Sequence, residues 1–224
     1  SDAGSLLADR ELGYTTIGVF FYDMCIDGNG DLYLTGSYGT NPYVTSCVKV
    51  DSGLTTNDFR ITAYDTPSKN GLYYQVTTDS NNDVYLAGRV EEFMSNDEAV
   101  GIAKCDGSNG SNTWKRTWAG NQDNFKCWGL CVHNNSGTEE IFVSPYDDTT
   151  NAEIGYILEY NTSGTLQNTY EYNGKASSTS NTYRRVNFGN IVSDGTSLYV
   201  AFTIDYDLGV AKIDPADGDI LWQK

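Results

Sequence analysis

Apolar and polar residues alternate with a period of two in short runs along the whole chain. One set of such runs contains Tyr22-Asp-Met24-Cys-Ile26, Tyr74-Gln-Val76, Trp128-Gly-Leu130-Cys-Val132 and, interrupted at its centre, Phe188-Gly-Asn190-Ile-Val192. Successive side chains of a strand point to opposite faces, so this alternation predicts β-strands. No stretch of useful length shows the 3.6-residue period of a helix, and we predict no helices.

Three further sets of runs recur along the chain at nearly constant spacing. Aromatic anchors follow polar turns at Tyr33, Tyr85, Phe142 and Tyr199. A second set recurs as Cys47-Val-Lys49, Ile102-Ala-Lys104, Ile157-Leu-Glu159 and Val210-Ala-Lys212. A third set follows glycine-containing turns, at Phe59, Trp114, Tyr170 and Trp222.

Each repeat of roughly 56 residues therefore predicts four short antiparallel strands, which is typical of a propeller blade. One such sheet has two apolar faces and cannot bury both alone, so blades stack around an axis. We predict an all-β fold, a β-propeller or propeller segment of four visible four-stranded antiparallel blades. The chain forms one domain over 1–224, with blades at about 15–65, 66–120, 121–175 and 176–224.

Two stretches carry a resemblance to known repeats. Asp207-Leu-Gly-Val-Ala-Lys212-Ile-Asp214-Pro-Ala-Asp-Gly218-Asp-Ile-Leu-Trp222 and the hairpin 27–36 are similar to the β-propeller repeat family of bacterial surface proteins and to quinoprotein-type repeats. The third unit departs from the pattern at His133 and Glu159. The resemblance implies the propeller fold and no particular chemistry. Since members more often have seven or eight blades, the four units either close as a small ring or form half of a larger one.

Charge narrows the classes of partner. The chain has 224 residues with 30 acidic and 14 basic side chains, giving a formal net charge of −16. Nucleic acid and anionic membrane surfaces need a basic patch, so we predict neither as a partner. No apolar run approaches the ~20 residues of a membrane-spanning helix. The 39% of hydrophobic residues is enough for a core, which argues against intrinsic disorder.

Several features favour an extracellular or cell-surface location. Three Asn-x-Ser/Thr sequons lie in polar, turn-like stretches, at Asn109, Asn134 and Asn161. The composition is acidic and rich in Tyr, Asn, Thr and Gly. Ser1-Asp-Ala-Gly lacks the features of a signal peptide, so we expect a processed chain or a piece of something larger.

The five cysteines are Cys25, Cys47, Cys105, Cys127 and Cys131, and none forms a CxxC pair. With a single histidine, His133, they do not complete a zinc site of the usual spacing. Their odd number leaves at least one thiol free or available to another chain. We predict a disulfide between Cys105 of the second unit and Cys127 of the third, across a blade interface.

Two acidic turns imitate the start of a calcium loop, and they contain Asp27, Asn29, Asp31 and Asp79, Asn81, Asp83. Alternating oxygen ligands suit calcium. However, Leu32 and Val84 stand where that loop requires glycine, and Tyr38 and Val90 stand where it requires glutamate. We favour hairpin turns in which the Asx side chains bond their own backbone, and we predict no cofactor, with calcium as the alternative.

One rim of the propeller is a candidate ligand site. In propellers that resemble this chain, the loops between second and third strands share a face with those between blades, and that face usually binds the ligand. The rim residues are aromatics and acids: Tyr22, Tyr74, Trp128, Phe188, Glu91, Glu92, Asp147, Asp148, Asp205 and Asp207. Aromatic faces stack on sugars or cations, and carboxylates bind hydroxyls or metal ions. The aromatics share their parity with Met24, Val76 and Leu130, so we favour packing between blades with the acids as solvated surface.

No catalytic constellation stands out. There is no Gly-x-Ser-x-Gly motif, no adjacent cysteine pair of the quinoprotein kind, and His133 is expected in an exposed turn. The leading hypothesis is a non-enzymatic extracellular binding or scaffold module that presents loops to a protein or glycan partner. It would act alone or in a homo- or hetero-assembly, including a surface fibre. The alternatives are a lectin and a propeller hydrolase, lyase or quinoprotein-like oxidoreductase with its site on the acidic rim.

Overall fold

The computed structural model describes residues 19–38, 44–53, 57–62, 71–91, 98–120, 125–147, 154–172, 186–204 and 207–224. Within these ranges every regular element is a β-strand. The first half contains β1 (Val19–Ile26), β2 (Leu32–Tyr38), β3 (Val44–Val50), β4 (Asn57–Thr62), β5 (Gly71–Thr78), β6 (Val84–Glu91), β7 (Glu98–Cys105) and β8 (Asn112–Trp118). The second half contains β9 (Phe125–Asn135), β10 (Thr138–Asp147), β11 (Gly155–Asn161), β12 (Leu166–Tyr172), β13 (Val186–Ser193), β14 (Leu198–Ile204), β15 (Asp207–Ile213) and β16 (Ile220–Gln223).

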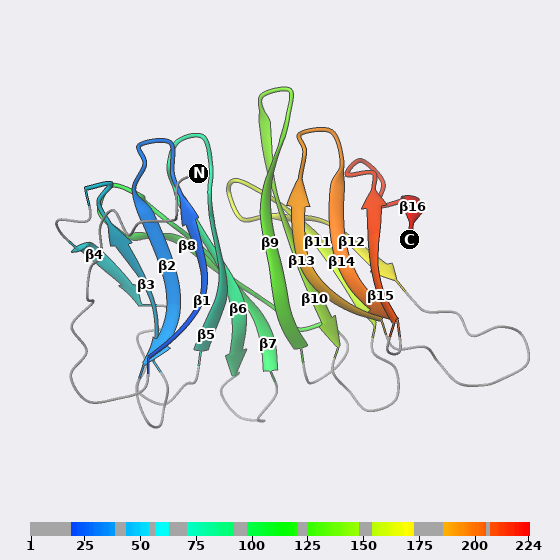
Figure 1. Cartoon of the computed structure of the whole chain (residues 1–224), viewed down its shortest axis with the longest axis horizontal. Coiled ribbons are helices and arrows are strands. Elements are labelled where there is room, and N and C mark those ends of the chain that lie inside the picture. The colour runs from blue at the N-terminus through cyan, green and yellow to red at the C-terminus, as the bar shows by residue number, and fades with distance from the viewer. Residues whose placement is uncertain are drawn as a thin grey trace, which may run out of the picture.

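The strands form four blades in chain order, β1–β4, β5–β8, β9–β12 and β13–β16. Consecutive strands of each blade pair antiparallel, and one parallel bridge between Val44 and Gly71 links the first two blades. The inner strands β1, β5, β9 and β13 pack side by side in that order, while β4 and β16 lie at opposite sides of the molecule (Figure 1). The predicted all-β propeller architecture is confirmed.

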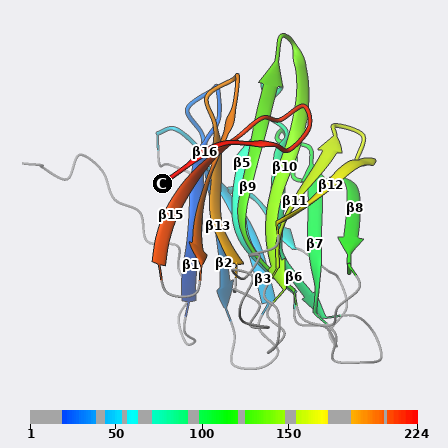
Figure 2. The same cartoon turned by 90° about the vertical axis from the view of Figure 1, so that its right-hand side faces the viewer.

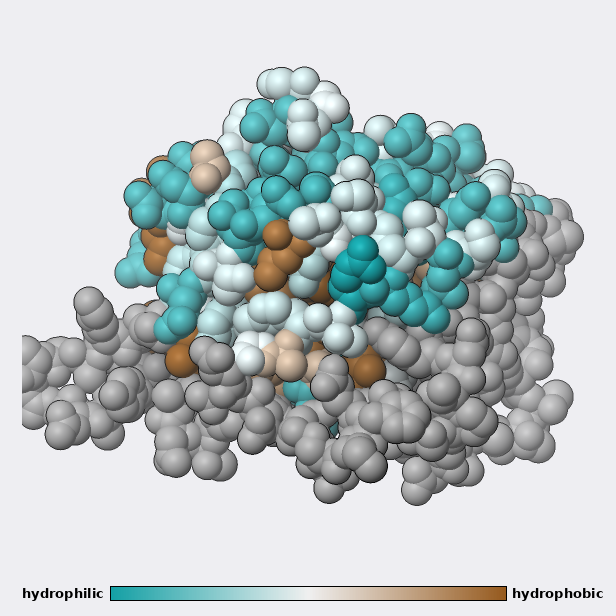
Figure 3. All heavy atoms as spheres, turned by 180° about the vertical axis from the view of Figure 1, so that it is seen from behind, coloured by the Kyte–Doolittle hydropathy of each residue, from teal (hydrophilic) through white to brown (hydrophobic). Residues whose placement is uncertain are grey.

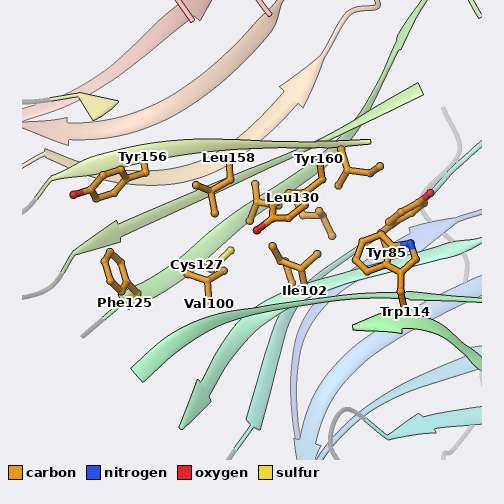
Figure 4. Packing of buried hydrophobic residues seen from close by; sticks show 13 residues of the cluster. Tyr85, Val100, Ile102, Trp114, Phe125, Cys127, Leu130, Tyr156, Leu158 and Tyr160 are labelled. Atoms are coloured by element: carbon orange, nitrogen blue, oxygen red, sulfur yellow. The ribbon is translucent and has the colours of Figure 1, made fainter. Parts of the chain in front are cut away.

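The core consists of three apolar layers, each between two successive blades. The middle layer joins Tyr85, Ile102 and Trp114 of the second blade to Leu130 and Leu158 of the third, and Figure 4 shows these side chains meeting between the two sheets. Similar clusters join the first blade to the second and the third to the fourth. The blades are therefore held together face to face. From behind, hydrophilic and intermediate residues dominate the described surface, and apolar residues form small patches (Figure 3).

A recurring polar clasp closes the outer edge of each blade interface. Trp114 donates a hydrogen bond from Nε1 to the carbonyl oxygen of Thr162, 3.0 Å away, and its ring covers Gly164 in the turn of the next blade. A Cβ atom at Gly164 would lie 2.6 Å from that ring, and the backbone has φ +77°. This turn therefore requires glycine both for its conformation and for the close approach of the indole.

The other two interfaces repeat the clasp with different donors. Tyr33 Oη and Lys49 Nζ donate to the carbonyl oxygen of Gly107, at 3.1 and 3.0 Å. Tyr172 Oη donates to the carbonyl oxygen of Gly218 at 2.6 Å. The glycine-containing turn of each following blade thus contacts side chains of the blade before it.

Trp114 tests the packing between blades. Replacement by Ala removes a buried indole and its hydrogen bond, so we expect a loss of about 3–5 kcal/mol in the free energy of unfolding. Leu166→Ala is the control, because Leu166 is exposed, and it should change stability by less than about 1 kcal/mol. Urea unfolding followed by far-UV circular dichroism measures both. Equal losses in the two variants would contradict the assignment of Trp114 to the core.

Candidate functional site

Three of the four predicted rim aromatics meet in one stack across the inner strands. The rings of Tyr22 on β1 and Tyr74 on β5 contact edge to face, with centroids 5.1 Å apart. Tyr74 and Trp128 on β9 are stacked, with centroids 4.5 Å apart and planes at 30°. Tyr74 is buried between its neighbours, whereas Tyr22 and Trp128 each remain 37% exposed. The stack therefore presents two aromatic side chains to solvent.

β-Bulges place these rings outside the packed blade faces. The register with the next strand shifts between Phe21 and Asp23 in β1, and between Tyr73 and Gln75 in β5. Each bulge inserts one extra residue, Tyr22 or Tyr74, and this breaks the two-residue period. The blade interface consequently takes Tyr73 rather than Tyr74. The expectation that Tyr22 and Tyr74 share the parity of Met24 and Val76 fails for this reason, whereas Phe188 packs between blades as we expected.

The fourth predicted aromatic is not part of the stack. Phe188 is buried and packs on Tyr172 with ring centroids 5.1 Å apart. The register shift in β13 comes after Phe188, so Gly189 takes the position that Tyr22, Tyr74 and Trp128 hold in the other blades. Phe188 instead lines an apolar pocket of about 240 Å³ between the third and fourth blades, together with Val186, Phe202 and Ile213.

An ion pair is close enough to the stack to interact electrostatically with Tyr74. Arg89 on β6 and Glu98 on β7 form a salt bridge across the two strands. Burial raises the pKa of Tyr74 to about 12, and the nearby positive charge of Arg89 opposes this shift. Tyr74 is therefore a neutral phenol over the physiological pH range. The site combines exposed aromatic surface with one paired cation and anion.

The acidic residues predicted for the rim do not form one cluster in the described chain. Asp147 is fully buried at the end of β10, which corrects its prediction as solvated surface. Asp207 is exposed at the start of β15, and Glu91 ends β6 opposite Glu98. Glu92, Asp148 and Asp205 lie outside the described residues.

The two calcium-like turns make the backbone hydrogen bonds that the Asx interpretation expects. Asp27 Oδ1 accepts from the N–H groups of Asn29 and Asp31 at 2.8 and 2.9 Å. Asp79 Oδ1 accepts from those of Asn81 and Asp83 at 3.0 and 2.8 Å. The turns are thus stabilised by local side-chain to backbone bonds.

A lysine on the third strand of the blade forms an ion pair with each turn. Lys104 Nζ lies 3.2 Å from Asp79 Oδ2 and 2.9 Å from Asp83 Oδ2, and Tyr85 Oη donates to Asp79 Oδ2. Lys49 pairs with Asp31 at 3.0 Å in the first blade. The repeated Asp, Tyr and Lys positions of the sequence therefore form one ion-paired hairpin unit. Among the described residues, no cluster of three or more His, Cys, Asp or Glu side chains could hold a metal ion.

The third blade replaces this unit with a buried histidine. His133 is almost fully buried on β9, so its prediction as an exposed turn residue is wrong. Its Nδ1 lies 2.7 Å from Ser193 Oγ of the fourth blade, and its ring meets Phe142 edge to face. The extended β9–β10 hairpin continues the strand beyond His133, which explains why the turn prediction failed. The His133–Ser193 contact is partly buried and joins two blades.

All five cysteines are free thiols in the structure. Cys105 packs in the layer between the first two blades, and Cys127 packs in the layer between the second and third. They lie on opposite sides of the second blade, so the predicted Cys105–Cys127 disulfide does not form. The prediction failed because Ile102 and Cys105 point to opposite faces of β7.

The three sequons occupy turns or strand ends. Asn109 and Asn134 are exposed, and Asn161 is half-buried. Asn161 Oδ1 accepts hydrogen bonds from the N–H groups of Ser163 and Thr165 at 3.1 and 2.9 Å. Asn109 and Asn134 are therefore the more accessible acceptors for glycosylation.

In the part of the chain that the structure describes, no helix is long and apolar enough to span a membrane.

Comparisons with known proteins bear on the fold alone. No protein-family model matches the chain, and no curated protein matches it. Among solved structures, it is similar to one described as the structure of the Dos1 propeller, with a TM-score of 0.58 and 9% sequence identity. The match covers 91% of this chain and 46% of that chain, so this chain spans about half the length of its neighbour. The chain has a β-propeller fold, and the specific repeat family stays a prediction.

Lys104→Met tests the ion-paired hairpin. It leaves the buried Asp79 carboxylate without its cation, so we expect a loss of about 3 kcal/mol in the free energy of unfolding. Lys115→Met, on the outer strand β8, should lose less than about 1 kcal/mol in the same urea titration.

Burial alone lowers the pKa of Lys104, but its bonds with Tyr85 and Asp83 raise the pKa above its ordinary value. This stabilisation is present below about pH 10.4 and is lost only as the pH rises through the raised pKa.

The thiols provide a second test. Burial raises the pKa of Cys127 and Cys131 to about 12, so almost no reactive thiolate exists at about pH 8. We expect Ellman's reagent to label these thiols slowly in the native chain and all five thiols after unfolding without reductant. A count of three after unfolding would indicate a disulfide and contradict the structure.

Proposed function

We propose that this protein is a non-enzymatic binding or scaffold module, which engages an extracellular protein or glycan partner through the Tyr22–Tyr74–Trp128 stack. The propeller fold is consistent with an interaction or scaffold role and specifies no chemistry. The observation that carries the proposal is the stack itself, because two of its rings remain exposed on inner strands of the propeller.

The stack has the properties of a rigid recognition surface. Aromatic side chains provide a large contact area with few rotatable bonds, so ordering them on binding costs little entropy. Here Tyr74 already fixes both neighbours through ring contacts. The faces of such rings bind the C–H groups of sugars and the apolar side chains of proteins. The Arg89–Glu98 pair adds a donor and an acceptor for polar groups of the same partner.

The extracellular assignment rests on separate features. The sequons at Asn109 and Asn134 are exposed and accept modification without unfolding a blade. The charge of −16 disfavours polyanionic partners. Neither the sequons nor the charge depends on the aromatic stack, so the location and the binding site are tested separately.

The proposed binding through the aromatic stack has a direct experiment. We expect the chain to be retained on an array of glycans or of extracellular protein domains, and Trp128→Ala to weaken the strongest interaction at least about tenfold. The matched control is Leu166→Ala, because Leu166 is exposed to nearly the same extent, on a different strand. Surface plasmon resonance measures all three proteins. Equal affinity of Trp128→Ala and wild type, or turnover of a substrate panel by the chain, would contradict the proposal.

A further inference from the structure

The two end blades of the described chain each leave one face uncovered. In the middle blades, one face contacts the preceding blade and the other contacts the following blade. We call these the receiving face and the presenting face. Among the described residues, no blade precedes the receiving face of the first blade, and none follows the presenting face of the last. Figure 2 views the molecule from the side of the last blade, where β13, β15 and β16 are labelled.

The uncovered receiving face has the residues of a blade interface. Met24 occupies the register position that Val76, Leu130 and Ile191 occupy in the other blades, because each lies opposite the equivalent residue of the next strand. Val76, Leu130 and Ile191 are buried, whereas Met24 is 68% exposed. Phe21, which corresponds to the buried Tyr73 and Phe188, is 53% exposed.

The uncovered presenting face shows the same contrast. Leu208 on β15 corresponds in register to Val100 on β7, and these residues are 88% and 0% exposed. Trp222 lies across Tyr199 with ring centroids 6.3 Å apart at 62°, close to the 6.0 Å and 61° of Trp114 and Tyr85. Trp222 nevertheless remains 45% exposed. The last blade therefore has the geometry of a presenting face without a neighbour.

Each end blade also carries one of the two partners of the polar clasp. In the three interfaces that form, the turn glycine of the following blade is buried beneath side chains of the preceding blade, at Gly107, Gly164 and Gly218. The glycine in the same turn of the first blade, Gly53, is exposed. Lys212 lies over Tyr199 as Lys49 lies over Tyr33, and in the first interface Lys49 bonds the turn of the next blade. One end thus has the donors of a clasp, and the other has its acceptor turn.

We propose that a second copy of this chain covers both faces, so that two copies close head to tail into one ring of eight blades. The presenting face of each copy would pack on the receiving face of the other and repeat the interface that each chain already forms three times. Such a contact is heterologous, and it closes when the rotation between copies completes the turn. Two features support closure. The end blades lie on opposite sides of the arc, and the match covers 46% of the Dos1 propeller chain (Figure 1).

The first measurement is the solution mass of the chain by sedimentation velocity over a range of concentrations. We expect a species of twice 24.6 kDa, and a disc with eight blades in negative-stain electron micrographs. Each copy carries −16, so screening should increase the dimer fraction as salt rises to about 0.15 M. A monomer at every concentration would overturn the proposal. A ladder of larger species would overturn the closed ring.

Two variants test the faces separately. Met24→Asp and Leu208→Asp each place a carboxylate in the proposed interface, and we expect each to raise the dimer dissociation constant at least about 100-fold. Both residues are exposed in the single chain, so the monomer should keep its far-UV circular dichroism and its melting temperature under dilute conditions. Leu166→Asp, on neither face, should dimerise as wild type does. Dimerisation of either face variant at wild-type strength would contradict a head-to-tail contact.

Discussion

The burial of both faces of each four-stranded sheet is the constraint on which the rest of the structure depends. A single blade is too small to form a core of its own, so the apolar layers lie between blades rather than within them. Side chains at successive positions of β7 therefore contact different neighbours: Ile102 packs toward the third blade and Ala103 toward the first. The stability and the shape of the protein therefore depend on the number of apolar layers that form between blades.

Polar contacts define the angle and register of each layer. The turn glycine of one blade lies beneath aromatic and cationic side chains of the preceding blade, and its carbonyl group accepts their hydrogen bonds. Because a side chain at Gly164 would collide with Trp114, neighbouring blades approach closely only with this pairing. The Asp, Tyr and Lys hairpin at the same end keeps its charges paired in partly buried surroundings. These contacts give specificity to layers that apolar burial alone would leave free to slide.

The candidate site arises from a departure from this regular packing. A bulge in each of the first inner strands releases one aromatic residue from the blade interface, and the released rings stack on one another. In the last blade the same position is Gly189, so the stack ends at Trp128. An aromatic surface built in this way is rigid, because each ring is carried by the strand of a different blade. The exposed apolar residues of the described end blades, such as Met24 and Leu208, form a separate surface.

The sequence by itself determined the strands, the four-blade repeat and the Asx hairpins, because these depend on local periodicity and turn chemistry. It also grouped Tyr22, Tyr74 and Trp128 together, but it included Phe188, which the structure places apart from them. Only the tertiary structure decided which way these rings point, because a bulge shifts parity and leaves no mark in the hydrophobic pattern. The separation of Cys105 from Cys127, and the burial of His133 and Asp147, were likewise decided by which blade covers each face. That information lies in contacts between residues of different blades, which the alternation along one strand does not contain.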